Sequence, residues 1–257
     1  MESAPPPPQP QRSDQPSAEI PALGRVRENR AWVWPLVLGI GAFFIVHPFD
    51  GPLSAQAARL AASLGGDIRR ELFAWQQYGQ GLAIIVTALL IFRLDPKRRV
   101  RLFDLLLIVI LSQVAAQAGK MLIGRPRPRE WFDDPRTFLG PLGEYPVKVK
   151  GEWKLLHAWD LPGGAGADLW SMPSSHTLFA AALSVFLGAL YPRIRVLAFA
   201  LAAMVGLGRV LFDAHWPTDV IVGGAIGWAI AAWVVHDQRG VRLFGRFKRA
   251  ESGRVPG

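Results

Sequence analysis

The sequence predicts an all-α membrane protein: a six-span transmembrane helical bundle with a long outward-facing loop between spans three and four. Hydrophobic residues make up 51% of the 257 residues and charged residues only 19%, a balance that favours a membrane protein. The apolar residues gather in six runs, each close to the length that crosses a bilayer once flanking polar residues are added. Tryptophans lie near the ends of several runs, where the aromatic belts of membrane proteins are found.

The six runs cover residues 32–46, 79–92, 102–118, 177–191, 194–207 and 220–235. A soluble bundle of buried helices is the alternative interpretation. Several runs are apolar all the way round, however, so they lack the charged face that a surface helix of a soluble bundle needs. Gly223, Gly224 and Gly227 form a small-residue pattern in the last run, which we interpret as a close contact between helices.

The two ends of the chain differ from the apolar centre. Residues 1–30 are predicted to be a disordered, proline-rich cytoplasmic tail, because they hold almost nothing that could be buried. The first apolar run begins only at Ala31, so we interpret it as a retained span and not as the core of a cleaved signal peptide. Residues 31–236 then form a six-helix membrane domain, and residues 237–257 a basic cytoplasmic tail.

The distribution of positive charge predicts the orientation. Short loops rich in lysine and arginine stay on the cytoplasmic side of a membrane. One such loop joins the second and third runs and contains Arg93, Lys97, Arg98, Arg99 and Arg101, and the segment after the sixth run is also basic. Both termini are therefore expected in the cytoplasm, and the long segment between the third and fourth runs on the outer face.

The charge and cysteine content restrict the chemistry. A formal net charge of +9 suggests an anionic partner, and because the basic residues lie between apolar runs we expect a phosphorylated lipid and the bilayer, not nucleic acid. The chain has no cysteine, which excludes disulfides and thiol catalysis. The acidic residues of the long loop lack the spacing of metal ligands, so no metal site is predicted there.

A first chemical cluster ends the third run. Lys120 is followed by the segment Gly124-Arg125-Pro126-Arg127-Pro128, in which glycine and proline stop the helix and hold the arginines in a turned, extended stretch. A lysine point charge and an arginine fork together suit a phosphoryl group. A basic run at a helix end also anchors lipid headgroups, so the cluster alone leaves both interpretations open.

A second cluster, Pro173-Ser174-Ser175-His176, begins the fourth run. Pro173 suits the first turn of a helix, so the backbone N–H groups of Ser174, Ser175 and His176 are predicted to be free at the positive end of the helix dipole. Ordinary helix capping with an unrelated histidine is the alternative.

The third cluster consists of Arg209, His215 and Asp219. Pro217 is predicted to open the sixth helix, which puts Asp219 in its first turn and within reach of a ring nitrogen of His215. A carboxylate there would fix the tautomer and leave the other nitrogen as a lone-pair donor, so His215 is a candidate nucleophile. A polar pair at the membrane edge is the alternative, but ionisable residues at the ends of spans mark function more often than structure.

In this order and spacing, the three clusters resemble the signature of the type 2 phosphatidic acid phosphatase superfamily, which includes lipid phosphate phosphatases and vanadium haloperoxidases. Six residues separate Lys120 from Arg127, and five separate Arg209 from His215, as in the family pattern. The resemblance covers roughly residues 75–235, and the joint match of three parts is far more specific than any one of them.

The resemblance implies an integral-membrane, metal-independent lipid phosphatase without a cofactor. By position His215 would attack phosphorus and form a phosphohistidine, Asp219 would orient it, and His176 would protonate the leaving oxygen. The phosphate-binding residues would be Lys120, Arg127, Ser174, Ser175 and Arg209, with no metal. Two positions depart from the family pattern: Ser175 replaces a glycine, and Gly208 replaces a serine whose hydroxyl could touch phosphate.

The substrate would be a phosphate monoester or diphosphate of a membrane lipid, such as phosphatidic acid, phosphatidylglycerol phosphate, undecaprenyl diphosphate or a lipid A phosphate. A bacterial inner membrane is the expected location, with the active site on the periplasmic or extracellular face. A lipid phosphotransferase using the same site is one alternative. A non-catalytic phospholipid binder or carrier is another, but binding alone would not need His176, His215 and Asp219 together. The oligomeric state stays open.

Overall fold

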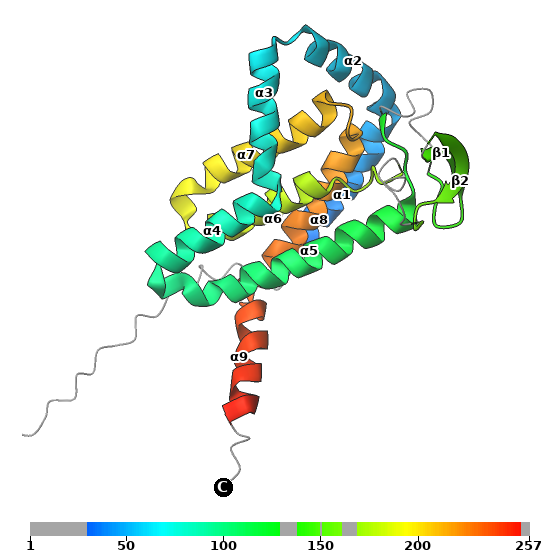
Figure 1. Ribbon diagram of the computed structural model, residues 1–257. Coiled ribbons are helices and arrows are strands. Elements are labelled where there is room, and N and C mark those ends of the chain that lie inside the picture. Colours follow the sequence, from blue (N-terminus) through cyan, green and yellow to red (C-terminus); the bar gives the residue numbers. More distant parts are fainter. Residues whose placement is uncertain (1–29, 129–137, 150, 161–168, 253–257) are drawn as a thin grey trace, which may run out of the picture.

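The computed structural model describes residues 30–128, 138–149, 151–160 and 169–252, and Figure 1 shows it as a ribbon. Most of these residues are helical, as predicted, and each of the six apolar runs coincides with one helix to within a few residues. These helices are α1 (Val33–Val46), α4 (Gly81–Leu94), α5 (Leu102–Ile123), α6 (Ser175–Leu190), α7 (Arg195–Leu211) and α8 (Pro217–His236). The predicted N-terminal tail lies outside the described residues, except for Arg30.

Helix α6 lies at the centre of the bundle and packs against α7 and α8, while α1 covers α8 from the other side (Figure 1). Glycines of α8 allow this packing. A Cβ atom added to Gly223 or Gly227 would overlap the backbone of α6 at Ser174 or Leu178, whereas one added to Gly224 would meet only ordinary van der Waals contact. The close helix contact predicted from the glycine pattern is therefore confirmed for Gly223 and Gly227.

The six predicted membrane spans are supported in part. Four helical segments of the described chain are long and apolar enough to cross a bilayer, namely Val33–Ser63, Pro96–Ile123, Pro192–Leu211 and Pro217–His236. A fifth candidate is the pair Gly66–Gly79 and Gly81–Leu94, which is bent by 60°.

Helix α6 accounts for the difference between these candidates and the six predicted spans. It has 16 residues, about 24 Å of helix, which is shorter than the roughly 30 Å hydrocarbon core of a bilayer. Ten of its residues are buried. Burial among other helices therefore explains why its sequence is apolar on all sides. Sequence alone does not distinguish such burial from contact with lipid.

Several elements were not predicted. Helices α2 (Asp50–Ser63) and α3 (Gly66–Trp75) and the short 3₁₀ helix Gln76–Gly79 fill the interval between the first two apolar runs. Strands β1 (Glu144–Val149) and β2 (Glu152–His157) form an antiparallel hairpin in the long loop. Helix α9 (Arg239–Ser252) lies in the predicted basic tail and extends away from the bundle (Figure 1).

Candidate active site

The three sequence clusters meet at one end of the bundle. Successive helices run in opposite directions, so the C-terminal ends of α5 and α7 lie beside the N-terminal ends of α6 and α8 (Figure 1). Lys120, Arg127, Arg209 and His215 all interact electrostatically with His176. Four cationic or potentially cationic side chains thus surround one histidine. Like charges at this range repel one another, so the arrangement is suited to holding an anion between them.

The segment after α5 carries Arg127 to this cluster. Gly124 ends α5 in the left-handed conformation, with φ 56° and ψ 53°, which glycine adopts without strain. Arg125 then forms an isolated bridge with Trp170, in which the Ser171 N–H donates to the Arg125 carbonyl at 3.0 Å. This pairing ties the extended stretch after α5 to the residues that lead into α6, as the glycine and prolines of the stretch predicted.

The start of α6 differs from the prediction in two ways. The helix begins at Ser175 with Ser174 as its N-cap, so Pro173 precedes the cap and is not in the first turn. The Ser174 N–H is not free, because it donates to the backbone carbonyl of Asp219 at 3.0 Å. The N–H groups of Ser175 and His176 lie in the first turn, where a helix provides no acceptor for them.

The side chain of Ser174 also has a local partner. Ser174 is fully buried, and its hydroxyl lies 3.1 Å from the hydroxyl of Thr177 on the next turn. Ser175, in contrast, is only partly buried. These contacts give Ser174 a structural role in joining α6 to α8, and its predicted role as a phosphate ligand stays a prediction.

His215 lies in the loop between α7 and α8 and is 2% exposed. Its Nδ1 lies 2.6 Å from the backbone carbonyl of Ser171. A carbonyl oxygen only accepts hydrogen bonds, so Nδ1 carries the proton and Nε2 of the neutral ring keeps its lone pair. Burial lowers the pKa of His215 to about 4; Arg209 adds to the lowering, and Asp219 opposes it. The ring is therefore neutral at pH 7, with Nε2 as an available nucleophile.

Asp219 occupies the predicted place, and its contact with His215 is an ion pair longer than a hydrogen bond. Pro217 opens α8, and Asp219 is the third helical residue, as predicted. Its Oδ2 lies 3.7 Å from Nδ1 of His215, which is too long for a hydrogen bond. The Ser171 carbonyl is the closer partner and fixes the tautomer, while Asp219 contributes a nearby negative charge. Asp219 also accepts hydrogen bonds from the Ser171 hydroxyl and, at 2.9 Å, from the Trp216 N–H.

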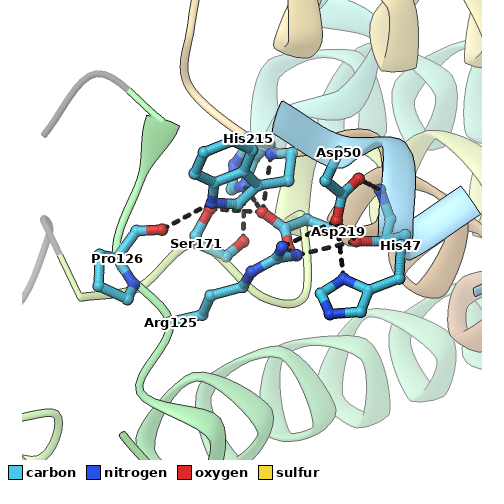
Figure 2. Close-up of polar contacts among 9 residues, drawn as sticks. His47, Asp50, Arg125, Pro126, Ser171, His215 and Asp219 are labelled. Atoms are coloured by element: carbon cyan, nitrogen blue, oxygen red, sulfur yellow. Dashed lines mark hydrogen bonds and ion pairs between the residues drawn. The ribbon is translucent and has the colours of Figure 1, made fainter. Parts of the chain in front are cut away.

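Behind Asp219 lies a buried charge network that the sequence did not reveal (Figure 2). Arg125, 1% exposed, bridges two fully buried carboxylates: it donates to Asp219 at 2.6 Å and to Asp50 at 2.8 Å. Asp50 also accepts the Thr218 N–H at 3.0 Å and the Thr218 hydroxyl. His47 completes the network, with Nδ1 3.1 Å from Asp50. The start of α2 is thus joined to the first turn of α8, which directly follows the loop that carries the nucleophile.

This network corrects one interpretation of the sequence and includes a histidine to which the sequence analysis assigned no role. That histidine, His47, contacts a buried carboxylate of the network. Arg125 does not face the cation cluster with Arg127 but neutralises the carboxylates behind it. The only sequence signal for Asp50 is its position as a polar residue shortly after an apolar run. Its partner Thr218 is 168 residues away in the sequence.

Two glutamines were also missed. Gln76, 2% exposed, accepts a hydrogen bond from Arg209 at 2.9 Å. Gln80 Nε2 lies 3.1 Å from His176 Nε2. Gly79 permits this approach, because a Cβ atom there would overlap the backbone carbonyl of His176. Their signal in the sequence is an amide-rich stretch directly before an apolar run.

Comparison with known proteins agrees with the geometry. The profile of the PAP2 superfamily matches residues 101–242. Phosphatidylglycerophosphatase B of Escherichia coli (strain K12) is 38% identical over 68 residues, which are 24% of this chain and 27% of that protein. A lipid A 1-phosphatase of Rhizobium etli is 30% identical over 119 residues, 46% of this chain and 42% of that protein. The matches thus span less than half the length of these curated relatives.

Two solved structures share the fold. LpxE of Aquifex aeolicus superimposes with a TM-score of 0.50 at 18% identity, covering 72% of this chain and 93% of that chain. A transmembrane PAP2-type phosphatidylglycerolphosphate phosphatase of Bacillus subtilis gives a TM-score of 0.50 at 17% identity, covering 82% and 96% of the two chains. The bundle is therefore an established transmembrane architecture.

Proposed function

Because the chain belongs to the PAP2 superfamily, we propose that it is an integral-membrane lipid phosphatase that needs no metal and acts through a phosphohistidine. The observation that carries the proposal is the state of His215. Its Nδ1 is held by the Ser171 carbonyl at 2.6 Å, which leaves the Nε2 lone pair beside a cluster of positive side chains. A phosphoryl group held by that cluster would meet the lone pair directly.

In the first step, Nε2 of His215 attacks phosphorus, and the bond from phosphorus to the lipid oxygen breaks. Negative charge on the phosphoryl oxygens is stabilised by Lys120, Arg127 and Arg209, which supply the positive charge that a metal ion supplies in other phosphoryl-transfer enzymes. The N–H groups of Ser175 and His176 at the start of α6 add two hydrogen-bond donors. Water then attacks the phosphohistidine, releases inorganic phosphate and restores His215.

His176 protonates the leaving lipid oxygen in this scheme. Lys120, Arg127, Arg209 and His215 interact electrostatically with His176, so the site has an excess of positive charge in the absence of an anion. A bound phosphate dianion reverses the local charge and favours protonation of His176. Binding of the substrate would therefore promote protonation of His176, the general acid. The same ring could accept a proton from the attacking water in the second step.

The ring of His215 becomes positively charged as it forms the phosphohistidine. Asp219, 3.7 Å from Nδ1, is placed to stabilise that charge. Arg125 and the Ser171 hydroxyl hold the carboxylate in position. Asp219 thus acts chiefly through electrostatics, while the Ser171 carbonyl sets the tautomer.

A phosphorylated or diphosphorylated membrane lipid is the proposed substrate. The relatives named above act on phosphatidylglycerophosphate and on the 1-phosphate of lipid A, and both substrates carry a phosphate on an apolar anchor. Many large apolar side chains of α1 and α4 are exposed, as expected for contact with lipid tails. We propose a bacterial inner-membrane location with six spans, including α6, and with the site on the periplasmic face.

Phosphate release from a lipid panel tests the proposal. Purified protein in detergent is given phosphatidylglycerol phosphate, a lipid A 1-phosphate, phosphatidic acid and undecaprenyl diphosphate in the presence of EDTA. We expect release from at least one lipid, with the His215→Ala variant inactive. Loss of release in EDTA would refute the metal-independent mechanism. Transfer of the phosphoryl group to another lipid, without free phosphate, would favour the phosphotransferase alternative.

A further inference from the structure

Gln76 has a hydrogen-bond donor that its known contacts do not use. Its Oε1 accepts from Nη1 of Arg209 at 2.9 Å. A guanidinium only donates, so this bond identifies the oxygen end of the amide and fixes Nε2 as the other end. Nε2 is buried and has no hydrogen-bond partner among the described residues. Buried amide donors are nearly always paired in folded proteins, so this one calls for an explanation.

The position of Nε2 relates it to the cation cluster. A Cβ atom added to Gly208, the residue before Arg209, would lie 3.4 Å from Nε2 and 3.3 Å from Cγ of Gln76. The amide therefore fills the space beside residue 208, the position where the family pattern has a serine hydroxyl. The 3₁₀ helix that carries Gln76 also packs against the backbone of His176 through Gly79. Gln76 therefore lies between Arg209, which it contacts, and the backbone of His176, against which its 3₁₀ helix packs.

We propose that Gln76 is a phosphate-binding residue, whose amide N–H donates to an oxygen of the phosphoryl group held by Arg209. The inference rests on the proposed function, which puts that group between Arg209 and His176. One amide would then serve two purposes: its oxygen orients the guanidinium, and its nitrogen binds the anion. Because the amide is neutral, it adds a directional bond without increasing the repulsion among the cations of the site.

A purely structural role is the competing explanation. In that case Gln76 only holds Arg209 in place, and its nitrogen is irrelevant to the ligand. An Arg209→Met background separates the two roles, because Gln76 then has no guanidinium to hold in place. The structural role therefore predicts that Gln76→Ala has no further effect on phosphate affinity in that background, whereas the donor role predicts that it still weakens binding.

The experiment measures binding of inorganic phosphate and of orthovanadate to the purified full-length protein by titration calorimetry. The variants are Gln76→Ala, Arg209→Met, the double variant that combines them and, as a matched control, Gln77→Ala, which alters an exposed glutamine of the same turn. We expect phosphate affinity to fall about tenfold in Gln76→Ala, the loss of one hydrogen bond to a charged group, and by a similar factor when Gln76→Ala is added to Arg209→Met. Gln77→Ala should stay within about twofold of the unmodified protein.

Unliganded melting temperatures are measured for all variants, so that a loss of binding is not confused with a loss of fold. Wild-type phosphate affinity in folded Gln76→Ala would overturn the inference, and so would equal affinities of Arg209→Met and the double variant. If Gln76→Ala does not fold, Gln76→Met, which keeps the length of the side chain, is used in its place.

Phosphate binding does not require turnover, so failure of this inference can be told from failure of the proposed function. If the unmodified protein binds phosphate, and Gln76→Ala weakens binding both alone and in the Arg209→Met background, the inference holds even when no lipid is hydrolysed. If lipid is hydrolysed while Gln76→Ala keeps wild-type phosphate affinity, the proposed function stands and the inference fails. Absence of phosphate and vanadate binding in the unmodified protein would overturn both.

Discussion

Arg125 is the residue whose removal tests the buried network most severely. It lies between two carboxylates that are fully buried, at 2.8 Å from Asp50 and 2.6 Å from Asp219. The variant Arg125→Met removes the positive charge and keeps an unbranched apolar stem of similar length. Asp50 and Asp219 would then face each other without this counter-ion, and one of them would have to take up a proton.

The structure sets the scale of the effect. Breaking a buried ion pair by removing one partner costs about 3–5 kcal/mol, and because one guanidinium here serves two carboxylates we expect about 5 kcal/mol. For a chain of this size, that loss corresponds to a fall in melting temperature of about 10–20 °C. Phosphatase activity should fall as well, because a protonated or displaced Asp219 no longer stabilises positive charge on His215.

Thermal unfolding of the purified protein, followed by tryptophan fluorescence, measures the effect. The control is Arg70→Met, which breaks an exposed pair with Asp67 and should change stability by less than about 0.5 kcal/mol. Adding Asp50→Asn to Arg125→Met removes one of the two facing carboxylates, so the double variant should be more stable than the sum of the single effects predicts, by about 1–3 kcal/mol. A melting temperature for Arg125→Met equal to that of the control, or strictly additive effects, would refute this account of the network.

Three further predictions concern the nucleophile, the packing and the topology. Burial lowers the pKa of His215 to about 4, so the ring should stay neutral as pH falls through 6.5 and gain its proton only near pH 4; ¹⁵N-histidine NMR would show this, and titration near 6.5 would contradict it. Gly227→Ala should lower the melting temperature by several degrees because its Cβ would overlap a carbonyl of α6, whereas Gly224→Ala, with ordinary contact distances, should change it little; equal effects would count against the packing. The chain has no cysteine, so variants with a single cysteine can be labelled on intact cells with a membrane-impermeant maleimide. Trp153→Cys in the exposed β-hairpin should react and Lys97→Cys should not; the reverse result would invert the proposed orientation.

The helices and the cation cluster could be predicted from the sequence because their signals are local. An apolar run of 14 to 17 residues indicates a buried or lipid-exposed helix wherever it lies, and all six runs form helices. Lys120, Arg127, His176, Arg209 and His215 could be assigned because they stand at fixed short spacings next to helix ends. The spacing of these residues in the sequence predicts which side chains lie at the same helix end, without any knowledge of tertiary contacts.

The remaining features depend on contacts between distant residues. Asp50 and Thr218 meet across 168 positions, and Gln76 and Arg209 across 133, so neither pair leaves a pattern in a local window. Helices α2 and α3 mix apolar with charged residues and therefore resemble a loop in composition. The tautomer of His215 is fixed by the Ser171 carbonyl, a backbone group that every residue possesses and that no sequence pattern marks.

The chemistry at His215 is the central claim, and trapping the intermediate tests it most directly. The purified protein is mixed with its preferred lipid substrate, quenched in alkali, which preserves phosphohistidine, and digested for mass spectrometry. We predict one phosphoryl group on His215 in the unmodified protein, and neither that adduct nor phosphate release in the His215→Asn variant. Phosphate release that persists in His215→Asn, or a phosphoryl group on any other residue, would contradict the mechanism.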